Sequence, residues 1–275
     1  MPAPSTITAD KLLRLLGLPR SPAIIDVRSE EAFTDDPRSI PGAVRRPALE
    51  VGQWAGDFRG RPAIVACRAG EELSQGVAAR LRYEGVAAEA LDGGVSGWSA
   101  AGLPMVPEAR LPARDGQGRT IWVTRARPKV DRIACPWLIR RFVDPEAIFL
   151  FVAPSEVAGV AERFGAAPFD VEGAFWSHRG ENCSFDTMIE ELELRRLEGL
   201  TRLAAIVRGA DTGRPDLTPQ SAGLLAASLG LSRMYADDLE QLAAGMPLYD
   251  AFYRWCRDAV DETHDWASHS RPKRS

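Results

Sequence analysis

Short apolar runs alternate with amphipathic segments along the first hundred residues. Three of these runs have the length of buried strands, namely 23–27 (AIIDV), 63–66 (AIVA) and 87–91 (AAEAL). Apolar residues recur at helical spacing over 8–16 and 74–84, where Thr8 and Ser74 are candidate N-caps. Strands that alternate with helices predict an α/β domain with a parallel sheet.

The second half of the chain begins with a strand–helix–strand pattern. Strands are predicted at 121–124 and 147–152, and a helix at 131–143 with Asp131 as its N-cap and Pro136 in its first turn. Amphipathic segments then predict four helices, at 200–214, 218–233, 236–246 and 247–260. We therefore expect a mostly helical α+β domain.

A change in composition divides the two halves. Residues 105–119 (MVPEARLPARDGQGR) are rich in proline, glycine and charge and have no apolar period, which is typical of a linker. The sequence predicts domains at 1–106 and 120–260, a linker at 107–119 and a disordered tail at 261–275.

Charge and cysteine usage exclude several classes of protein. The 275 residues carry a formal net charge of −4, which argues against a general nucleic-acid-binding protein. We find no apolar run long enough to span a bilayer and no signal-peptide pattern at the N-terminus. The four cysteines, Cys67, Cys135, Cys183 and Cys256, form no CxxC pair, and Cys256 is expected in the core. We expect a cytoplasmic protein with no membrane contact and no cofactor.

Cys67 ends the apolar run 63–66, and a polar loop follows it before the next helix. In a parallel sheet, the loop after the carboxyl end of a strand is the usual place for chemistry. Backbone N–H groups and a helix N-terminus facing the sulfur would lower the thiol pKa and favour the nucleophilic thiolate. The alternative is a buried, unreactive cysteine.

Four segments of this half resemble the rhodanese family of sulfurtransferase domains. They are IIDVRSEEAF (24–33), IPGAV (40–44), CRAGEELS (67–74) and LDGGVSGWSAAGLP (91–104). The resemblance implies a rhodanese-like parallel-sheet α/β domain. It also implies a catalytic set of Cys67, Arg68 and Asp26, in which Cys67 carries a persulfide.

The sequence departs from the usual pattern of that family in two places. Ser39 stands where a histidine is common, and Glu71 and Glu72 occupy the middle of a loop that commonly carries a second arginine. These carboxylates would repel an anionic donor such as thiosulfate and raise the thiol pKa, and Arg68 offsets only part of that effect. A domain that binds or senses without catalysis is therefore the alternative to a sulfurtransferase.

The second half contains a basic stretch. Between Arg119 and Arg141 there are seven basic residues and one acidic residue. A polar stretch at 175–192 holds a histidine and an arginine before a helix that Cys183 or Ser184 would cap. Arginines beside a helix N-terminus bind oxyanions well. We therefore expect an anion-binding site formed by Arg125, Arg127, Arg132, His178 and Arg179; the alternative is a solvated basic face.

Metal binding is another use for His178, the only histidine outside the predicted tail. Its candidate co-ligands are Cys183, Asp131 and Asp211. Because the sequence has no dense ligand motif of the zinc type, we expect no metal.

Five segments between residues 121 and 257 resemble the C-terminal region of the ChrB-type chromate-resistance proteins. They are WVTRARPKVDRIACPWLIRRFVDPEA, SHRGENCSFD, IVRGADT, GLSRMYADD and LYDAFYRWCR. The resemblance implies a role in chromate resistance. Chromate is a tetrahedral dianion that suits the predicted anion site and oxidises thiols such as Cys67, Cys135 and Cys183.

The expected function is resistance to chromate or a related oxyanion, with a sulfurtransferase-type Cys67. Its partners would be a small oxyanion and a sulfur acceptor that the sequence does not identify. Two alternatives stay open, a non-catalytic chromate-sensing regulator and a metal-dependent enzyme centred on His178.

Overall fold

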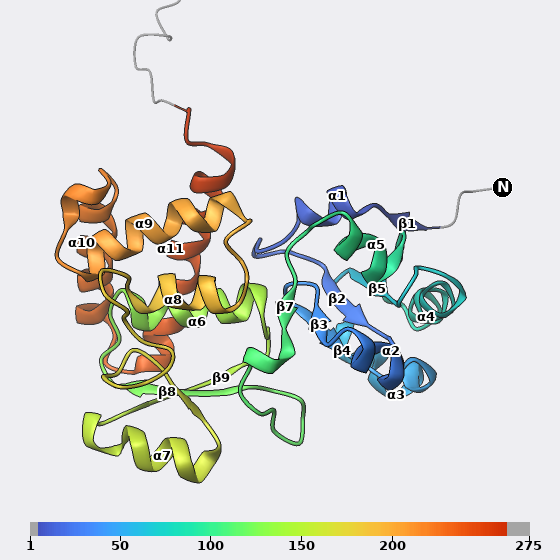
Figure 1. Cartoon of the computed structure of the whole chain (residues 1–275), viewed down its shortest axis with the longest axis horizontal. Coiled ribbons are helices and arrows are strands. Elements are labelled where there is room, and N and C mark those ends of the chain that lie inside the picture. Colours follow the sequence, from blue (N-terminus) through green and yellow to red (C-terminus); the bar gives the residue numbers. More distant parts are fainter. Residues whose placement is uncertain (1–4, 263–275) are drawn as a thin grey trace, which may run out of the picture.

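The computed structural model describes residues 5–262 and has two halves that lie side by side (Figure 1). The N-terminal half is a parallel-sheet α/β domain, and the C-terminal half is mostly helical around a smaller parallel sheet, as the sequence predicts. Most of the predicted tail at 261–275, with His264 and His269, lies outside the described residues. None of the helices in the described part of the chain has the length and hydropathy needed to cross a bilayer.

Five parallel strands form the N-terminal sheet in the order β1-β6-β5-β2-β4. Their bounds are β1 (Thr6–Ile7), β2 (Ala23–Asp26), β4 (Ala43–Arg45), β5 (Ala63–Ala66) and β6 (Ala88–Leu91). Every residue of β2 and β5 is buried, as expected for a parallel sheet that is covered on both faces. The three strands predicted from the apolar runs are confirmed to within one residue at each end.

Helices cover both faces of this sheet. They are α1 (Ala9–Leu13), α2 (Glu30–Asp35), α3 (Val51–Trp54), α4 (Glu72–Tyr83) and α5 (Gly94–Ala100). Successive side chains of a strand point to opposite faces. Ile24 and Ile64 therefore join the apolar core that continues into the C-terminal half, whereas Ile25 and Val65 join a second core with α3 and α4.

Of the two N-caps predicted in this half, the position of one is confirmed and the other is wrong. Thr8 is the residue before α1, as expected, but its side chain makes no capping hydrogen bond, and α1 ends at Leu13. The prediction of Ser74 as an N-cap is wrong, because α4 begins two residues earlier, after Glu71. The Ser74 hydroxyl group is used elsewhere, beside Cys67.

The C-terminal half is built on three parallel strands in the order β10-β8-β9. They are β8 (Ile121–Arg125), β9 (Ile148–Val152) and β10 (Ala167–Pro168). Helix α6 (Asp131–Phe142) covers one face and α7 (Val157–Phe164) the other (Figure 1). Trp122 belongs to the core on the α6 side, and its neighbour Val123 packs with Val157 of α7. The two predicted strands are confirmed to within one residue.

Four further helices complete this half. They are α8 (Ser184–Glu191), α9 (Glu198–Asp211), α10 (Ser221–Met234) and α11 (Asp238–Asp258). Three of them, α8, α9 and α11, pack on α6, and α10 packs on the outside of α9 and α11. The two helices predicted within 236–260 are one, because α11 continues through Pro247. Its buried face runs past the proline, with Tyr253 against Trp137, and this packing outweighs the backbone hydrogen bond that proline removes. Pro136 likewise lies in the middle of α6 rather than in its first turn.

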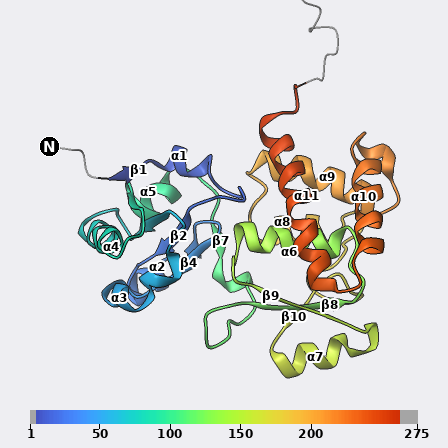
Figure 2. The same cartoon turned by 180° about the vertical axis from the view of Figure 1, so that it is seen from behind.

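The two halves pack closely against each other. Strand β7 (Val106–Pro107) passes between them and pairs with β3 (Arg38–Ser39) (Figure 2). Gly17 has a φ of +72°, and a side-chain carbon there would meet Phe142 of α6 and Tyr253 of α11. The two halves therefore share a hydrophobic core and are not separated by a free linker.

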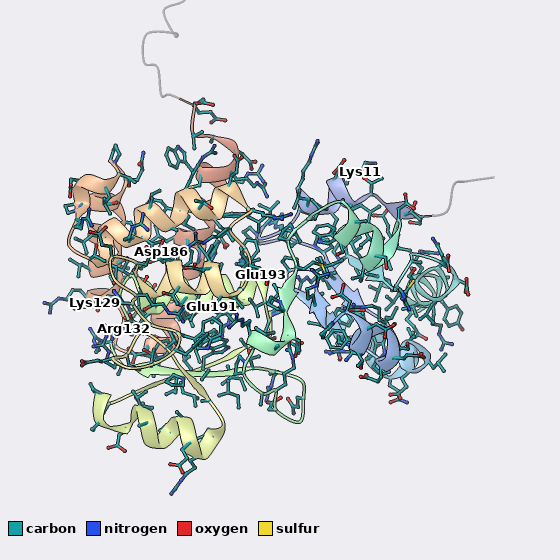
Figure 3. The ribbon with its side chains drawn as sticks, in the orientation of Figure 1. Lys11, Lys129, Arg132, Asp186, Glu191 and Glu193 are labelled. Atoms are coloured by element: carbon teal, nitrogen blue, oxygen red, sulfur yellow. The ribbon has the colours of Figure 1, made fainter. Side chains whose placement is uncertain are left out.

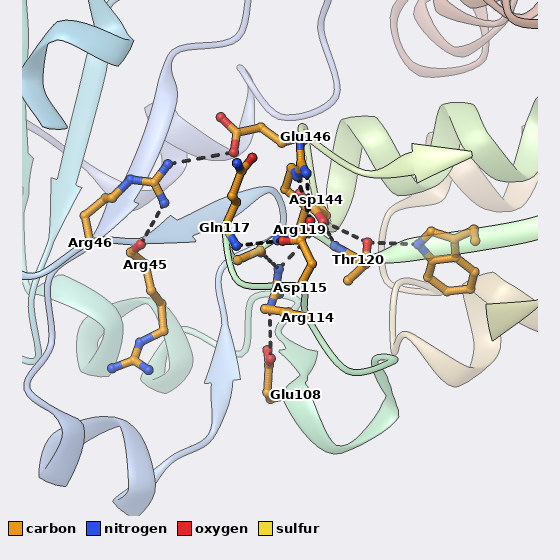
Figure 4. A network of polar contacts seen from close by, with 12 residues as sticks. Arg45, Arg46, Glu108, Arg114, Asp115, Gln117, Arg119, Thr120, Asp144 and Glu146 are labelled. Atoms are coloured by element: carbon orange, nitrogen blue, oxygen red, sulfur yellow. Dashed lines mark hydrogen bonds and ion pairs between the residues drawn. The ribbon is translucent and has the colours of Figure 1, made fainter. Parts of the chain in front are cut away.

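A polar network lies where the predicted linker, 107–119, enters β8 (Figure 4). Arg114 donates to Glu108 and to the Gly118 carbonyl group and lies 3.7 Å from Asp144. The Asp144 carboxylate also accepts hydrogen bonds from the Thr120 N–H and hydroxyl groups. The segment between Glu108 and Thr120 is thus fixed by hydrogen bonds and an ion pair that involve Arg114 and Asp144.

Candidate functional site

Cys67 follows the last residue of β5, the central strand of the N-terminal sheet. The loop after it leads directly into α4, as the sequence predicts. The cysteine is 4 % exposed and lines a surface pocket of about 340 Å³. A small molecule that enters this pocket would meet the thiol at a strand end.

Hydrogen-bonding groups converge on the Cys67 sulfur. The Gly70 N–H group donates to Sγ over 3.2 Å, and the Cys67 thiol donates to the buried Ser74 hydroxyl oxygen over 3.2 Å. The Ser74 hydroxyl group donates to the Glu71 carbonyl group over 3.1 Å and would turn to the sulfur once Cys67 is ionised. Burial raises the pKa of Cys67. The hydrogen bonds from the Ser74 hydroxyl and from the N–H groups of Ser74, Glu71 and Gly70 outweigh burial, so the pKa lies below its ordinary value. The thiolate is therefore more populated here than in a free cysteine.

The start of α5 fixes the other side of this loop. The N–H groups of Val95 and Ser96 donate to the carbonyl groups of Cys67 and Arg68, both over 2.9 Å. Gly94 has a φ of +56°, and a side-chain carbon there would come within 2.4 Å of the Cys67 carbonyl oxygen. Gly94 of the LDGG segment thus allows the backbone at the start of α5 to contact the backbone of the loop after Cys67, and this contact fixes the conformation of that loop.

Asp26 and Arg68, which the rhodanese resemblance groups with Cys67, have other partners. Asp26 accepts hydrogen bonds from Nε and Nη2 of Arg28, and both side chains are buried. Arg68 is exposed and lies 3.4 Å from Asp35. Asp26 therefore supports the fold through Arg28, and Arg68 contributes to the lining of the pocket.

The lining of the Cys67 pocket also carries acidic groups. Glu31, Glu71 and Glu72 line it together with Arg68, and all four residues are exposed. Arg28 also lines it, but its guanidinium group is buried and paired with Asp26. The three glutamates outnumber the two arginines, so a dianion that approaches the thiol meets repulsion.

A second polar cluster lies at the carboxyl edge of the C-terminal sheet. Asp131 begins α6, Asp170 follows β10, His178 precedes α8 and Asp211 ends α9. The Nε2 atom of His178 lies 3.2 Å from Asp211 Oδ2, 3.3 Å from Asp170 Oδ1 and 3.6 Å from Asp131 Oδ2. We call these four residues the His178 cluster.

Asp131 is not the N-cap that the sequence suggested. Val130 is the N-cap of α6, and the Asp131 carboxylate accepts a hydrogen bond of 2.6 Å from the Ser184 N–H group. Asp131 is fully buried, and its Oδ1 atom has no hydrogen-bond partner among the described residues. Burial, and then the neighbouring carboxylates of Asp211 and Asp170, raise the pKa of Asp131 well above its ordinary value.

His178 supplies positive charge to this cluster. Hydrogen bonds to Asp170 and then Asp211 raise the pKa of His178 to about 10, against the opposing effect of partial burial. The imidazole is therefore protonated at neutral pH. A protonated Nε2 atom carries a single hydrogen, whereas three carboxylates face it.

Two of the predicted anion-binding arginines reach the same cluster. Asp170 Oδ2 lies 3.3 Å from Arg125 and 3.2 Å from Arg132. Arg132 is on the side of the C-terminal half that faces away from the N-terminal half (Figure 3). The structure thus brings Arg125, Arg132 and His178 together, but it sets carboxylates between them that balance their charge.

The other two predicted anion-binding residues lie elsewhere. The backbone N–H of Arg127 donates to Asp238, and its guanidinium group donates to carbonyl groups of Ser232 and Tyr235. Arg179 forms an ion pair with Glu191. Neither side chain is part of the His178 cluster.

Asp170 is the residue that the sequence reasoning missed. It follows β10, which has only two residues and which the apolar pattern does not reveal. An acidic residue directly after the apolar segment AAPF (166–169) is the signal that could have found it.

The other three cysteines differ from Cys67. Burial raises the pKa values of Cys135 and Cys183 well above the ordinary value and that of Cys256 to about 11. Cys183 is the N-cap of α8, as one of the two predicted caps, and its Sγ lies 3.2 Å from Asp186. Cys256 is fully buried, which confirms it as a core residue.

The sequence matches two known domain families. Residues 8–101 match the rhodanese-like domain, and residues 122–256 match the family described as ChrB, C-terminal domain. Protein ChrB of Cupriavidus metallidurans is 33 % identical over 145 residues, which are 50 % of this chain and 41 % of that protein. This chain thus covers less than half the length of that curated relative.

Two solved structures are similar to the N-terminal half. A rhodanese-like domain protein from Staphylococcus aureus is 26 % identical, with 34 % of this chain and 90 % of that chain covered and a TM-score of 0.31. A thiosulfate sulfurtransferase from Pseudomonas aeruginosa is 27 % identical, with 38 % of this chain and 20 % of that chain covered and a TM-score of 0.34.

Proposed function

We propose that this chain, in which a rhodanese-like domain (8–101) precedes a ChrB C-terminal domain (122–256), transfers sulfane sulfur through Cys67 in a response to chromate. One observation carries the proposal. The Cys67 sulfur lies at a strand end, among N–H and hydroxyl donors, and lines a pocket. Of the four cysteines, it is the one whose pKa is lowered rather than raised.

The chemistry has two steps. In the first, the Cys67 thiolate attacks the outer sulfur of a donor with a sulfur–sulfur bond. A new bond forms at Cys67, the donor bond breaks, and the donor leaves with the electron pair, as sulfite when the donor is thiosulfate. In the second, an acceptor thiolate attacks the outer sulfur of the persulfide and Cys67 leaves as thiolate. The surrounding donors stabilise the negative charge on sulfur throughout.

The acidic lining of the pocket favours a particular class of donor. Glu31, Glu71 and Glu72 oppose the approach of the thiosulfate dianion. The terminal sulfur of a protonated small-molecule persulfide is neutral, whereas the outer sulfur of thiosulfate carries negative charge, so the persulfide sulfur meets less repulsion at the thiol. We therefore propose a persulfide of a small thiol as the donor.

The C-terminal half supports the link to chromate. It resembles the corresponding region of ChrB-type chromate-resistance proteins, and residues 122–256 match that family. Because chromate oxidises thiols, a chain that moves sulfane sulfur acts on the same cellular pool of sulfur compounds.

A transfer assay tests this function. Glutathione persulfide serves as donor and a small thiol as acceptor, and the rate is measured for the wild type, Cys67→Ser and Cys256→Ser. We expect Cys67→Ser to abolish the transfer and Cys256→Ser to retain it. Equal rates in the wild type and Cys67→Ser would refute the role of Cys67.

A further inference from the structure

The His178 cluster contains more negative charge than its single imidazole can satisfy. Three carboxylates face Nε2 of His178 at 3.2–3.6 Å. One hydrogen on that nitrogen cannot be shared equally among them. Asp131 is fully buried, and its Oδ1 atom has no partner among the described residues. An unpaired buried carboxylate oxygen costs free energy, and a cation bound beside Asp131 would offset that cost, which Arg125 and Arg132 do not do because they contact Asp170.

The distances fit a metal ion. One donor atom each from Asp131, Asp170 and His178 lies within 4.8 Å of the other two. Donors that bind a divalent cation at about 2.0–2.2 Å lie about 2.8–3.6 Å apart in octahedral or tetrahedral geometry. The three distances from Nε2 of His178 to the carboxylate oxygens, 3.2–3.6 Å, fall within this range.

Neighbouring groups hold these donors in place. The Ser184 hydroxyl group donates to Asp170 Oδ1 over 2.8 Å, and Arg125 and Arg132 contact the other oxygen of the same carboxylate. Outer contacts of this kind orient the ligands of metal sites. Arg125 and Arg132 hold Asp170 Oδ2, so Oδ1 is the oxygen that faces His178.

We propose that the His178 cluster binds one divalent cation of the manganese class, with Asp131, Asp170 and His178 as its ligands and Asp211 as a neighbouring carboxylate. The ion takes the place of the proton on Nε2 of His178. Carboxylates suit hard cations such as Mg²⁺, Ca²⁺ and Mn²⁺, whereas an imidazole suits first-row transition metals; Mn²⁺ satisfies both preferences. The His178 side chain is 41 % exposed, so one side of the ion faces solvent and can take water or another oxygen ligand.

Metal titration of the full-length chain tests this site. The protein is dialysed against a chelator and titrated with Mn²⁺, and bound metal is followed by electron paramagnetic resonance and elemental analysis. We expect one Mn²⁺ per chain. His178→Gln and Asp211→Asn should each weaken the affinity for Mn²⁺ by about tenfold to a hundredfold. Glu191→Gln, which removes a nearby carboxylate outside the cluster, and Cys67→Ser should bind like the wild type.

Two results would overturn the proposal. One is a folded wild-type protein that takes up no Mn²⁺, and the other is equal Mn²⁺ affinity in His178→Gln and the wild type. Because the His178 side chain is half-exposed, this variant should fold even if the aspartate variants do not, as circular dichroism will show. The Cys67→Ser control separates this site from sulfur transfer, since either can fail alone.

Discussion

Replacing Ser74 by alanine should raise the pKa of Cys67 and slow its alkylation at neutral pH. The Ser74 hydroxyl group is buried and accepts a hydrogen bond of 3.2 Å from the Cys67 thiol. When Cys67 ionises, this hydroxyl group donates to the sulfur in place of the Glu71 carbonyl group. A hydrogen bond to a charged group contributes about 1.5–3 kcal/mol, which corresponds to roughly 1–2 pKa units. Below both pKa values, the thiolate fraction and the alkylation rate should therefore fall by about tenfold to a hundredfold.

The assay is the rate of iodoacetamide labelling of Cys67 as a function of pH, read by peptide mass spectrometry. The rate rises with pH through the thiol pKa, because only the thiolate reacts. The wild-type midpoint should lie below the ordinary value of 9.0, and that of Ser74→Ala should lie higher. At high pH the two rates should converge, whereas a collapsed loop would lower the plateau as well.

Ser96→Ala is the matched control. Ser96 is an exposed serine of α5, and only its backbone N–H group bonds the same loop. Its midpoint should equal that of the wild type. If folded Ser74→Ala also keeps the wild-type midpoint, then the hydroxyl group does not stabilise the thiolate and the reasoning about the loop is refuted.

Three further changes test neighbouring parts of the account. Gly94→Ala forces a side-chain carbon against the Cys67 loop, so urea unfolding should show a free energy of unfolding that is lower by about 1–3 kcal/mol. In the control Gly76→Ala, where no atom lies within 4 Å of the added carbon, the free energy of unfolding should not fall. Equal losses in the two variants would contradict the close contact. Glu72→Arg removes a repulsive charge from the pocket and should raise the transfer rate with thiosulfate; an unchanged rate would mean that this carboxylate does not influence the donor. Sulfate should bind beside Arg132 only in Mn²⁺-loaded protein, because carboxylates balance the arginines without metal; calorimetry showing equal affinity in chelator-treated protein would contradict this.

The strands and the place of Cys67 were predictable because their causes are local. A parallel strand covered on both faces is a continuous apolar run, so β2, β5 and β6 are visible in the sequence. The chain order of strand, loop and helix then places Cys67 at a carboxyl edge. The lowered pKa of Cys67 also follows from that placement, although Ser74, whose hydroxyl group lowers it most, is not the helix cap that the sequence suggests.

The C-terminal cluster could not be derived in the same way because its partners are distant in sequence. Asp131 has the residue type and position of an N-cap, yet its carboxylate accepts a hydrogen bond from the N–H group of Ser184, more than fifty residues away in the sequence. Asp170 follows a strand of two residues that exists only because β8 lies beside it. The sequence around the basic stretch therefore does not reveal the distant carboxylates that face Arg125 and Arg132.

Intact-mass analysis of the full-length protein after incubation with glutathione persulfide tests the central claim most directly. The account predicts that the wild-type chain gains one sulfur atom, that a small thiol removes it, and that Cys67→Ser gains none while Cys256→Ser behaves like the wild type. A wild-type chain that gains no sulfur, or a Cys67→Ser chain that gains as much, would contradict it.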